Sequence, residues 1–192
     1  MYHGAMFDVS PVWTGRLVRL RAIEPSDAER FNADQWDSEA QRTGYEINVP
    51  RSMERQRRWA TDESLSDGPA PFEFRFAIET LLEGELVGSM NTHGASPRNG
   101  NFEYGIAIFR DHRGKGYASD AIRLVLRYYF KELRFNKANA TVYAFNEASL
   151  ALHRKFGFVE EGRIRQNLFT NGQYHDEHWF GMTAAEFFAR YP

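Results

Sequence analysis

Seven stretches of the chain are predicted to form strands, and apolar and polar residues alternate in the second, the fifth and part of the first, a period of two typical of strands with one buried face. These stretches are residues 17–23, 72–78, 85–91, 102–109, 137–145, 158–168 and 174–182. Turn segments at Glu83-Gly84 and at residues 96–100 separate three of the strands, which predicts an antiparallel meander. Thr170-Asn171-Gly172-Gln173 predicts a hairpin turn between the last two strands.

Other segments carry the signals of helices. Apolar residues recur every three or four positions from Ala118 to Leu133, which predicts an amphipathic helix of roughly 16 residues. Shorter helices are predicted within residues 24–37, 51–65 and 147–155, with a connector at 45–50, and the capping box Thr183-Ala184-Ala185-Glu186 begins a closing helix. Together these elements predict an α+β fold whose mixed sheet has about seven strands.

The composition agrees with a single folded domain. Hydrophobic residues make up 42% of the chain, charged residues 26% and aromatic residues 15%, which argues against disorder, a coiled coil and collagen. Because 24 Lys and Arg oppose 26 Asp and Glu, there is no basic field to attract nucleic acid or an anionic membrane, and neither partner is expected. Without repeats or linkers, one domain is expected over residues 1–192, with its core at about 17–188.

The sequence also favours a cytoplasmic location. Cysteine is absent, which excludes disulfides, thiolate nucleophiles and cysteine-containing zinc sites and fits a reducing compartment. Residues 1–11 lack the basic start and apolar stretch of a signal peptide. Arg123 and Arg127 interrupt the most apolar segment, residues 121–130, so no membrane span is expected.

A glycine-rich loop at residues 109–118 joins a strand to the long helix and predicts an anion site. Main-chain N–H groups at a helix N-terminus are unpaired and carry the positive end of the helix dipole. Gly114 and Gly116 let the backbone approach a ligand, while Arg113 and Lys115 add positive charge. The simpler alternative is a glycine turn that only begins the helix.

Two familiar phosphate loops do not fit this segment. The nucleotide P-loop requires a Lys after its last Gly and then Ser or Thr, but Lys115 precedes Gly116 and no Ser or Thr follows in register. The dinucleotide fingerprint begins correctly at Gly114 and Gly116, but Ser119 stands at its third glycine, and the preceding strands form a meander. A nucleotide-phosphate enzyme is therefore not favoured.

As R-x-x-G-x-A, the residues Arg113, Gly116 and Ala118 resemble the pyrophosphate-binding motif of the GNAT superfamily of acyl-CoA-dependent N-acetyltransferases. The resemblance covers about residues 17 to 188 in the right order. It implies a single GNAT-like domain with an antiparallel N-terminal meander, splayed central strands and flanking helices. Further motifs resemble the branch that acetylates the N-termini of ribosomal proteins; they are Asn146-x-x-Ser149, Lys155-Phe156-Gly157-Phe158, Glu161-Gly162-Arg163 and Asp176.

The resemblance implies acetyl-CoA as co-substrate and assigns its contacts by position. The pantetheine arm would lie between the splayed strands, against the backbone of Ile106, Ala107 and Ile108. The pyrophosphate would be bound by Arg113, Gly114, Lys115, Gly116, Tyr117 and Ala118. Asn146 would bond the arm from the other side, and Lys155 would reach an adenosine phosphate, unless it only complements the helix dipole.

The implied reaction is direct attack of a neutral amine on the acetyl thioester in a ternary complex, with a main-chain N–H near Ile106 or Ala107 stabilising the developing oxyanion. Many superfamily members place a Tyr general acid where this chain has His153. Ser149 is the substitute acid for the sulfur; its alternatives are a helix-start residue or a CoA hydrogen-bonder.

Glu103 on the central strand is the candidate general base, acting directly or through water; its alternative is a solvent-facing strand residue. His93 and Asp176 are further candidates for binding the substrate, although such strand-end residues are more often structural. His175 and His178 are three positions apart on a strand and would point to opposite faces, so no metal is expected.

The leading hypothesis is therefore an N-acetyltransferase that acts on a primary amine. A protein N-terminus, a polyamine, an aminoglycoside-like drug and a small amino compound are all open as acceptors, and the segment from about 31 to 71 is expected to line the acceptor site. The alternative is a non-catalytic acyl-CoA-binding sensor or scaffold. A homodimer is common in the family, and no residue demands one.

Overall fold

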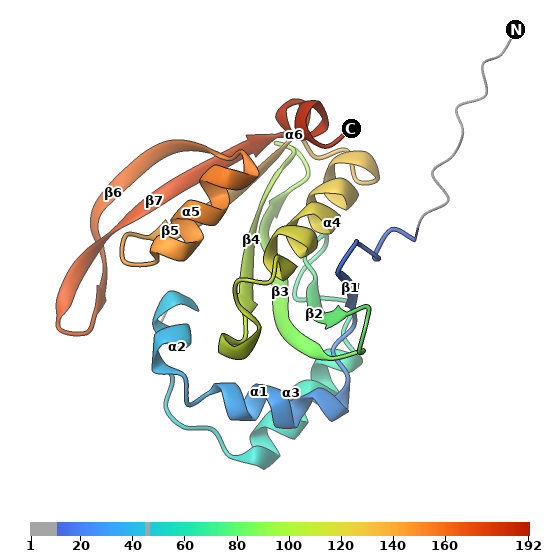
Figure 1. The fold of residues 1–192 in the computed structure, drawn as a ribbon, viewed down its shortest axis with the longest axis vertical. Coiled ribbons are helices and arrows are strands. Elements are labelled where there is room, and N and C mark those ends of the chain that lie inside the picture. The colour runs from blue at the N-terminus through green and yellow to red at the C-terminus, as the bar shows by residue number, and fades with distance from the viewer. Residues whose placement is uncertain (1–10, 45–46) are drawn as a thin grey trace, which may run out of the picture.

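The computed structural model describes residues 11–44 and 47–192 and contains one seven-stranded sheet with flanking helices (Figure 1). The strands are β1 (Val18–Arg21), β2 (Arg75–Thr80), β3 (Leu86–Ser96), β4 (Asn101–Ile108), β5 (Lys137–Tyr143), β6 (Val159–Thr170) and β7 (Gln173–Thr183). The helices are α1 (Ala28–Asp34), α2 (Ser38–Gly44), α3 (Met53–Ser64), α4 (Tyr117–Lys131), α5 (Glu147–Phe156) and α6 (Ala184–Arg190), with 3-10 turns η1 (Pro25–Asp27) and η2 (Arg110–His112).

The sheet has the order β1-β2-β3-β4-β5-β7-β6; β2 to β4 form the expected antiparallel meander, and β1 pairs antiparallel with β2 at its edge. β4 and β5 run parallel, but they pair at only three positions near their starts, the last being Glu103 with Asn139. Beyond that pair the two strands separate, and Figure 1 shows them diverging. The expected α+β fold with a meander and splayed central strands is therefore confirmed.

α4 and α5 cover one face of the sheet. Phe102 of β4 stacks on Tyr129 of α4 with ring centroids 3.7 Å apart, and Tyr104 of β4 reaches His153 of α5. α6 joins the two helices, because Phe187 packs against α4 and its neighbour Tyr191 against α5. The apolar stripe of α4 is buried here, as its spacing predicts.

α1 and α3 cover the opposite face, over β2 and β3. Ala28 of α1 and Ala60 of α3 pack against Ala77 of β2 in a small second core. Since Ala77 pairs with Ser89 and Ser89 with Ala107, these three residues share this face of the sheet. This face therefore offers the α1–α3 pair a continuous surface that extends to β4.

Two details differ from the elements predicted by the pattern. The strand expected from Phe72 begins only at Arg75, because Phe72 has φ 64° and the Phe74 amide donates to Thr92 Oγ1 at 2.8 Å instead of a main-chain carbonyl. α2 was not expected at all. Its segment buries no residue, and Asp37 caps it by accepting from the amides of Glu39 and Ala40 at 3.1 Å each.

Two expectations fall partly outside the described residues. Residues 45 and 46 of the connector lie outside them, as do residues 1–10 of the segment judged not to be a signal peptide. Within residues 11–44 and 47–192, no helix has both the length and the apolar character needed to cross a membrane.

Candidate active site

The glycine-rich loop presents a row of free main-chain amides at the start of α4. Gly114 and Gly116 have φ of 77° and 87°, conformations that favour glycine. Within the described structure, the amides from Gly114 to Ser119 find no hydrogen-bond acceptor, and the first to do so is Asp120, which donates to Gly116 O at 3.2 Å. These donors lie at the positive end of a 15-residue helix, so the loop fits a diphosphate.

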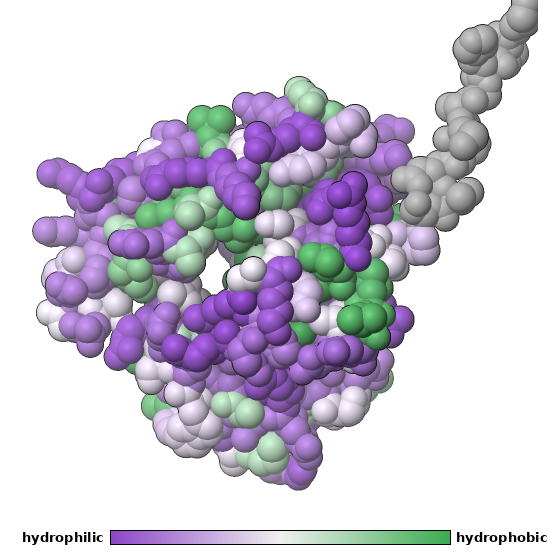
Figure 2. Space-filling model, viewed as in Figure 1, coloured by the Kyte–Doolittle hydropathy of each residue, from purple (hydrophilic) through white to green (hydrophobic). Residues whose placement is uncertain are grey.

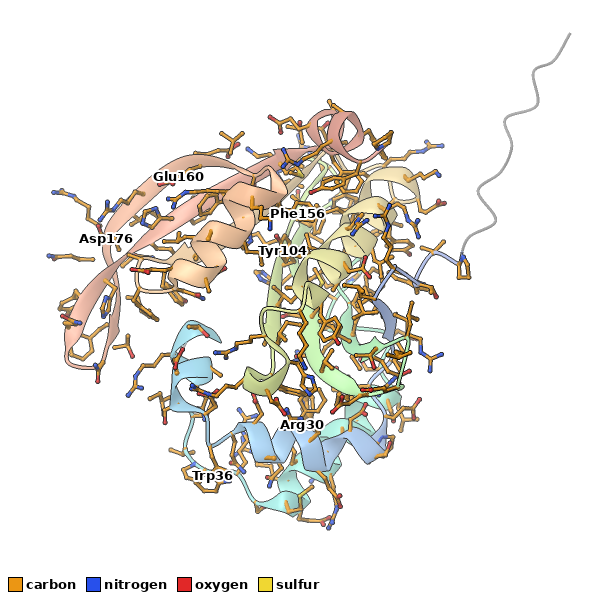
Figure 3. All side chains as sticks on the ribbon, in the orientation of Figure 1. Arg30, Trp36, Tyr104, Phe156, Glu160 and Asp176 are labelled. Carbon is orange, nitrogen blue, oxygen red and sulfur yellow. The ribbon has the colours of Figure 1, made fainter. Side chains whose placement is uncertain are left out.

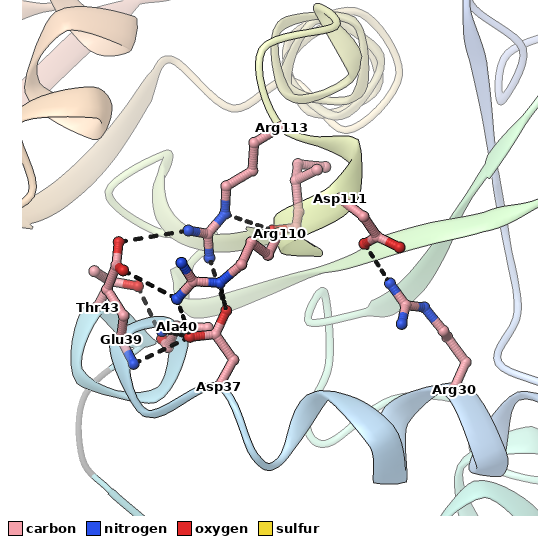
Figure 4. Close-up of polar contacts among 9 residues, drawn as sticks. Arg30, Asp37, Glu39, Ala40, Thr43, Arg110, Asp111 and Arg113 are labelled. Atoms are coloured by element: carbon pink, nitrogen blue, oxygen red, sulfur yellow. Dashed lines mark hydrogen bonds and ion pairs between the residues drawn. The ribbon is translucent and has the colours of Figure 1, made fainter.

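The Arg113 side chain is turned toward α2, and its Nε donates to Ile108 O at 3.1 Å (Figure 4). Its guanidinium lies 3.9 Å from Asp37 and 3.7 Å from Glu39. Arg110 also binds Asp37, at 2.9 and 2.6 Å, and holds the pKa of that carboxyl at about 2. The Arg113 amide donates to Arg110 O at 3.4 Å, and its side-chain charge is shared with Asp37 and Glu39, so the free amides of the loop begin at Gly114.

The space left by the separation of β4 from β5 is the candidate site for the pantetheine arm. Ile106, Ala107 and Ile108 lie on the separated part of β4, beyond its last pair with β5. Figure 2 shows an opening through the centre of this face of the molecule, between α5 and β4 as placed in Figure 1. Asn146 begins α5 on the other side; its Oδ1 accepts from the Ser149 amide at 3.1 Å, which leaves its NH₂ group free within the described structure.

Tyr104 on β4 (Figure 3) begins a hydrogen-bonded chain that crosses the start of this gap to α5. His153 Nδ1 lies 2.8 Å from Ser149 O, which can only accept, so Nδ1 carries the proton. Nε2 of His153 therefore accepts from the Tyr104 hydroxyl at 3.0 Å. Burial lowers the pKa of His153 and raises that of Tyr104, which keeps both groups neutral. Ser149 Oγ lies 3.3 Å from Nδ1 and keeps its own proton available.

Glu103 lies at the last paired position of β4, on the face opposite Tyr104. Its register partner on β3 is the exposed His93, so the structure brings these two candidates together. Asp176 lies far along the β6–β7 hairpin (Figure 3), where it accepts from Arg163 at 2.7 Å and from the Gln166 amide at 2.8 Å. Lys155 is exposed near the end of α5.

A cavity of about 260 Å³ opens on the face covered by α1 and α3. Ser89 contributes to its floor, and Ser89 is the register partner of Ala107 on β4. Neighbouring strands lie about 4.8 Å apart, so the cavity is one strand away from the candidate thioester site. The lining residues are Phe31, Asp34, Gln35, Gln41, Asn48, Val49, Arg51, Gln56, Trp59, Arg75 and Ser89.

Sequence reasoning expected residues of the 31–71 segment near the acceptor but singled out none of them. Asp34 and Gln56 belong to no motif, and Ser89 lies outside that segment. Asp34 becomes a notable residue only when α1 is known to end there, because a carboxylate at the C-terminus of a helix is disfavoured by the helix dipole. In the part of the chain that the structure describes, no group of three or more acidic or His side chains is arranged to hold a metal ion.

Comparison with known proteins agrees with this architecture. Residues 17–159 match the family model described as an acetyltransferase (GNAT) domain. YokL, an uncharacterized N-acetyltransferase derived from the SPbeta prophage of Bacillus subtilis, is 42% identical over 91% of this chain and 94% of its own. The putative ribosomal N-acetyltransferase YdaF of the same organism is 30% identical over 88% and 92%.

A solved structure shares the fold. The spermidine N-acetyltransferase of Vibrio cholerae, in complex with CoA and spermine, aligns with a TM-score of 0.75 at 24% identity over 89% of this chain and 98% of that one. The family model covers most of the sequence, and the splayed strands and amide-lined loop are present. The chain therefore belongs to the GNAT acetyltransferase family and is an acetyl-CoA-dependent N-acetyltransferase.

Proposed function

We propose that the protein acetylates a primary amine of a small molecule, which binds in the 260 Å³ cavity and reacts at the edge of β4. The observation that carries this proposal is a juxtaposition. The loop with its free amides comes directly after β4. The separated part of β4 contains Ala107, the register partner of Ser89 in the cavity wall. A co-substrate and an acceptor can thus approach the same point from opposite sides.

Acetyl-CoA supplies the activated acetyl thioester. The amides of residues 114–119 bind its diphosphate, and the Asn146 NH₂ group and the edge of β4 orient the arm. The Phe109 amide donates to Val87 O of β3 at 2.9 Å, so strand alternation turns the Ala107 N–H toward β3 and the Ile106 N–H toward the gap; we assign the Ile106 N–H to stabilise negative charge on the acetyl oxygen. Most of the rate enhancement then comes from orientation of the two reactants.

The two proton transfers are assigned to opposite faces of the sheet. Glu103, on the face that carries the acceptor cavity, takes a proton from the amine nitrogen directly or through water as that nitrogen bonds to the acetyl carbon. Ser149, on α5, gives its hydroxyl proton to the departing sulfur. The His153 Nδ1–H points at Ser149 oxygens, so the Ser149 hydroxyl hydrogen is not used in this contact and is available for transfer.

The cavity favours a small acceptor over a protein N-terminus. Its volume of about 260 Å³ is just below the usual range of small-molecule sites. The names of the similar proteins include both a putative ribosomal and a spermidine N-acetyltransferase. We therefore propose a small amine, and not a protein N-terminus, as the acceptor.

A panel of amines tests the proposal. CoA thiol release is measured with acetyl-CoA and diamines, monoamines, aminoglycosides and peptides with free N-termini, and a small aliphatic amine is expected to give the highest kcat/KM. Preference for the peptides would contradict the choice of acceptor. Binding of acetyl-CoA without transfer to any amine would instead support a non-catalytic acyl-CoA-binding module.

Ser149→Ala and Glu103→Gln test the proton transfers. Both variants should bind acetyl-CoA normally and lose about 10²-fold or more in kcat. Unchanged kcat in either variant would refute its assigned role.

A further inference from the structure

Three polar side chains without a partner converge on the acceptor cavity. Gln56 of α3 is only 7% exposed, yet its side-chain amide makes no hydrogen bond with any described residue. The Ser89 hydroxyl and the Asp34 carboxylate, both half-buried, are likewise unpaired within the described structure. A ligand that fills the cavity displaces the water around these three groups and must supply their hydrogen bonds, which indicates a polar ligand.

Of the three side chains, Asp34 has surroundings that disfavour its charged form. It is the last residue of α1, where the helix dipole opposes a negative charge. Partial burial and the neighbouring carboxylate of Asp37 raise its pKa, and nearby Arg30 and Arg113 offset this only in part. The helix dipole, partial burial and Asp37 thus all disfavour the charged form of Asp34, and such a perturbed carboxylate in a cavity is typical of a functional residue.

The rest of the cavity suits a cation on an aliphatic stem. Phe31 and Trp59 pack edge to face with ring centroids 5.2 Å apart and form an aromatic wall. Arg75 lines the cavity but is paired with Glu63 at 3.2 Å, and Arg51 donates to Asn48 at 2.8 Å. Arg51 and Arg75 are thus directed to other partners, whereas Asp34 makes no hydrogen bond or ion pair with a described residue, and Arg30 and Arg113 offset its charge only in part.

We infer that the cavity binds a protonated amine through Asp34, with Gln56 and Ser89 as hydrogen-bond partners, and that the preferred acceptors are diamines or polyamines. This inference rests on the proposed function. One amine pairs with Asp34 while the aliphatic stem lies against Phe31 and Trp59. The other amine, in its neutral form, attacks the acetyl thioester beside Ala107, one strand from Ser89.

The test compares two acceptors of equal length, 1,4-diaminobutane and n-butylamine, in the CoA-release assay. The wild-type protein should favour the diamine by about 10- to 100-fold in kcat/KM, mainly through KM, as expected for one charge-assisted bond. Asp34→Asn should remove that preference by raising KM for the diamine to that of the monoamine. Asp67→Asn, in an exposed turn, is the matched control and should behave as wild type.

A second readout separates binding from folding. Because the Asp34 charge is unfavourable without ligand, Asp34→Asn should keep or raise the Tm of the free protein while abolishing the increase in Tm that 1,4-diaminobutane produces with CoA present. Equal diamine preference in Asp34→Asn and Asp67→Asn, or equal use of both amines by the wild type, would overturn the inference. Transfer to no amine at all, with acetyl-CoA bound, would refute the proposed function instead.

Discussion

Tyr104→Phe removes one hydroxyl from the chain that links β4 to α5, and its effect can be worked out from the structure. Tyr104 is 5% exposed and His153 is 3% exposed, so no water replaces the lost donor readily. His153 Nδ1 is committed to Ser149 O, which leaves Nε2 as a buried acceptor without a partner. The loss should cost about 1–3 kcal/mol. At roughly 2–4 °C per kcal/mol for a chain of this size, Tm should fall by about 2–12 °C.

Calorimetry at pH 8 measures this change, with Tyr174→Phe as the control. Tyr174 is exposed on the β6–β7 hairpin, and its hydroxyl has no hydrogen-bond partner in the described structure. His153→Phe and the double variant complete a cycle that isolates the coupling of the two side chains. A Tyr104→Phe protein as stable as Tyr174→Phe, or a coupling energy of zero, would refute the tautomer and the role assigned to this pair.

Three further predictions follow from the loop, the α2 ion pairs and the buried His. Gly116→Trp should abolish the increase in Tm produced by acetyl-CoA, whereas Gly84→Trp, at a positive φ in open space, should retain it in the same thermal-shift assay. Arg110→Gln should raise the pKa of Asp37 from about 2 toward 3.8, measured by carboxyl ¹³C NMR; an unchanged value would exclude Arg110 as the cause. His153 has a lowered pKa in the folded protein, so it is neutral there and protonates first in the unfolded chain. Stability should therefore fall as pH drops below about 6.5, and chemical denaturation should show a shallower fall in His153→Phe.

Elements with a strong local signal could be predicted from the sequence. The apolar spacing of α4 placed that helix within two residues of its observed ends, 117 and 131. The β6–β7 turn was predictable because Asn171 and Gly172 adopt the positive φ values of 51° and 77° that its two central positions require. The capping box was equally local, and Thr183 and Glu186 make both of its hydrogen bonds.

Features set by contacts between distant segments were not predictable. α2 buries no residue and has no apolar period; Arg110 and Arg113, about 70 residues further along the chain, bind Glu39 in its first turn. Likewise, the resemblance to the GNAT superfamily shows that His153 stands where many members have Tyr, but only the fold shows that its partner is Tyr104. The polar lining of the acceptor cavity comes from α1, α3 and β3, which no single motif spans.

The central claim is that the free amides of residues 114–119 and the gap between β4 and β5 hold acetyl-CoA. A crystal structure of the protein with CoA tests it most directly. We expect diphosphate oxygens within about 3 Å of several of these amides, with the pantetheine arm between Ile106 and Asn146. A diphosphate bound elsewhere, or a gap closed by side chains with the arm outside it, would contradict the claim.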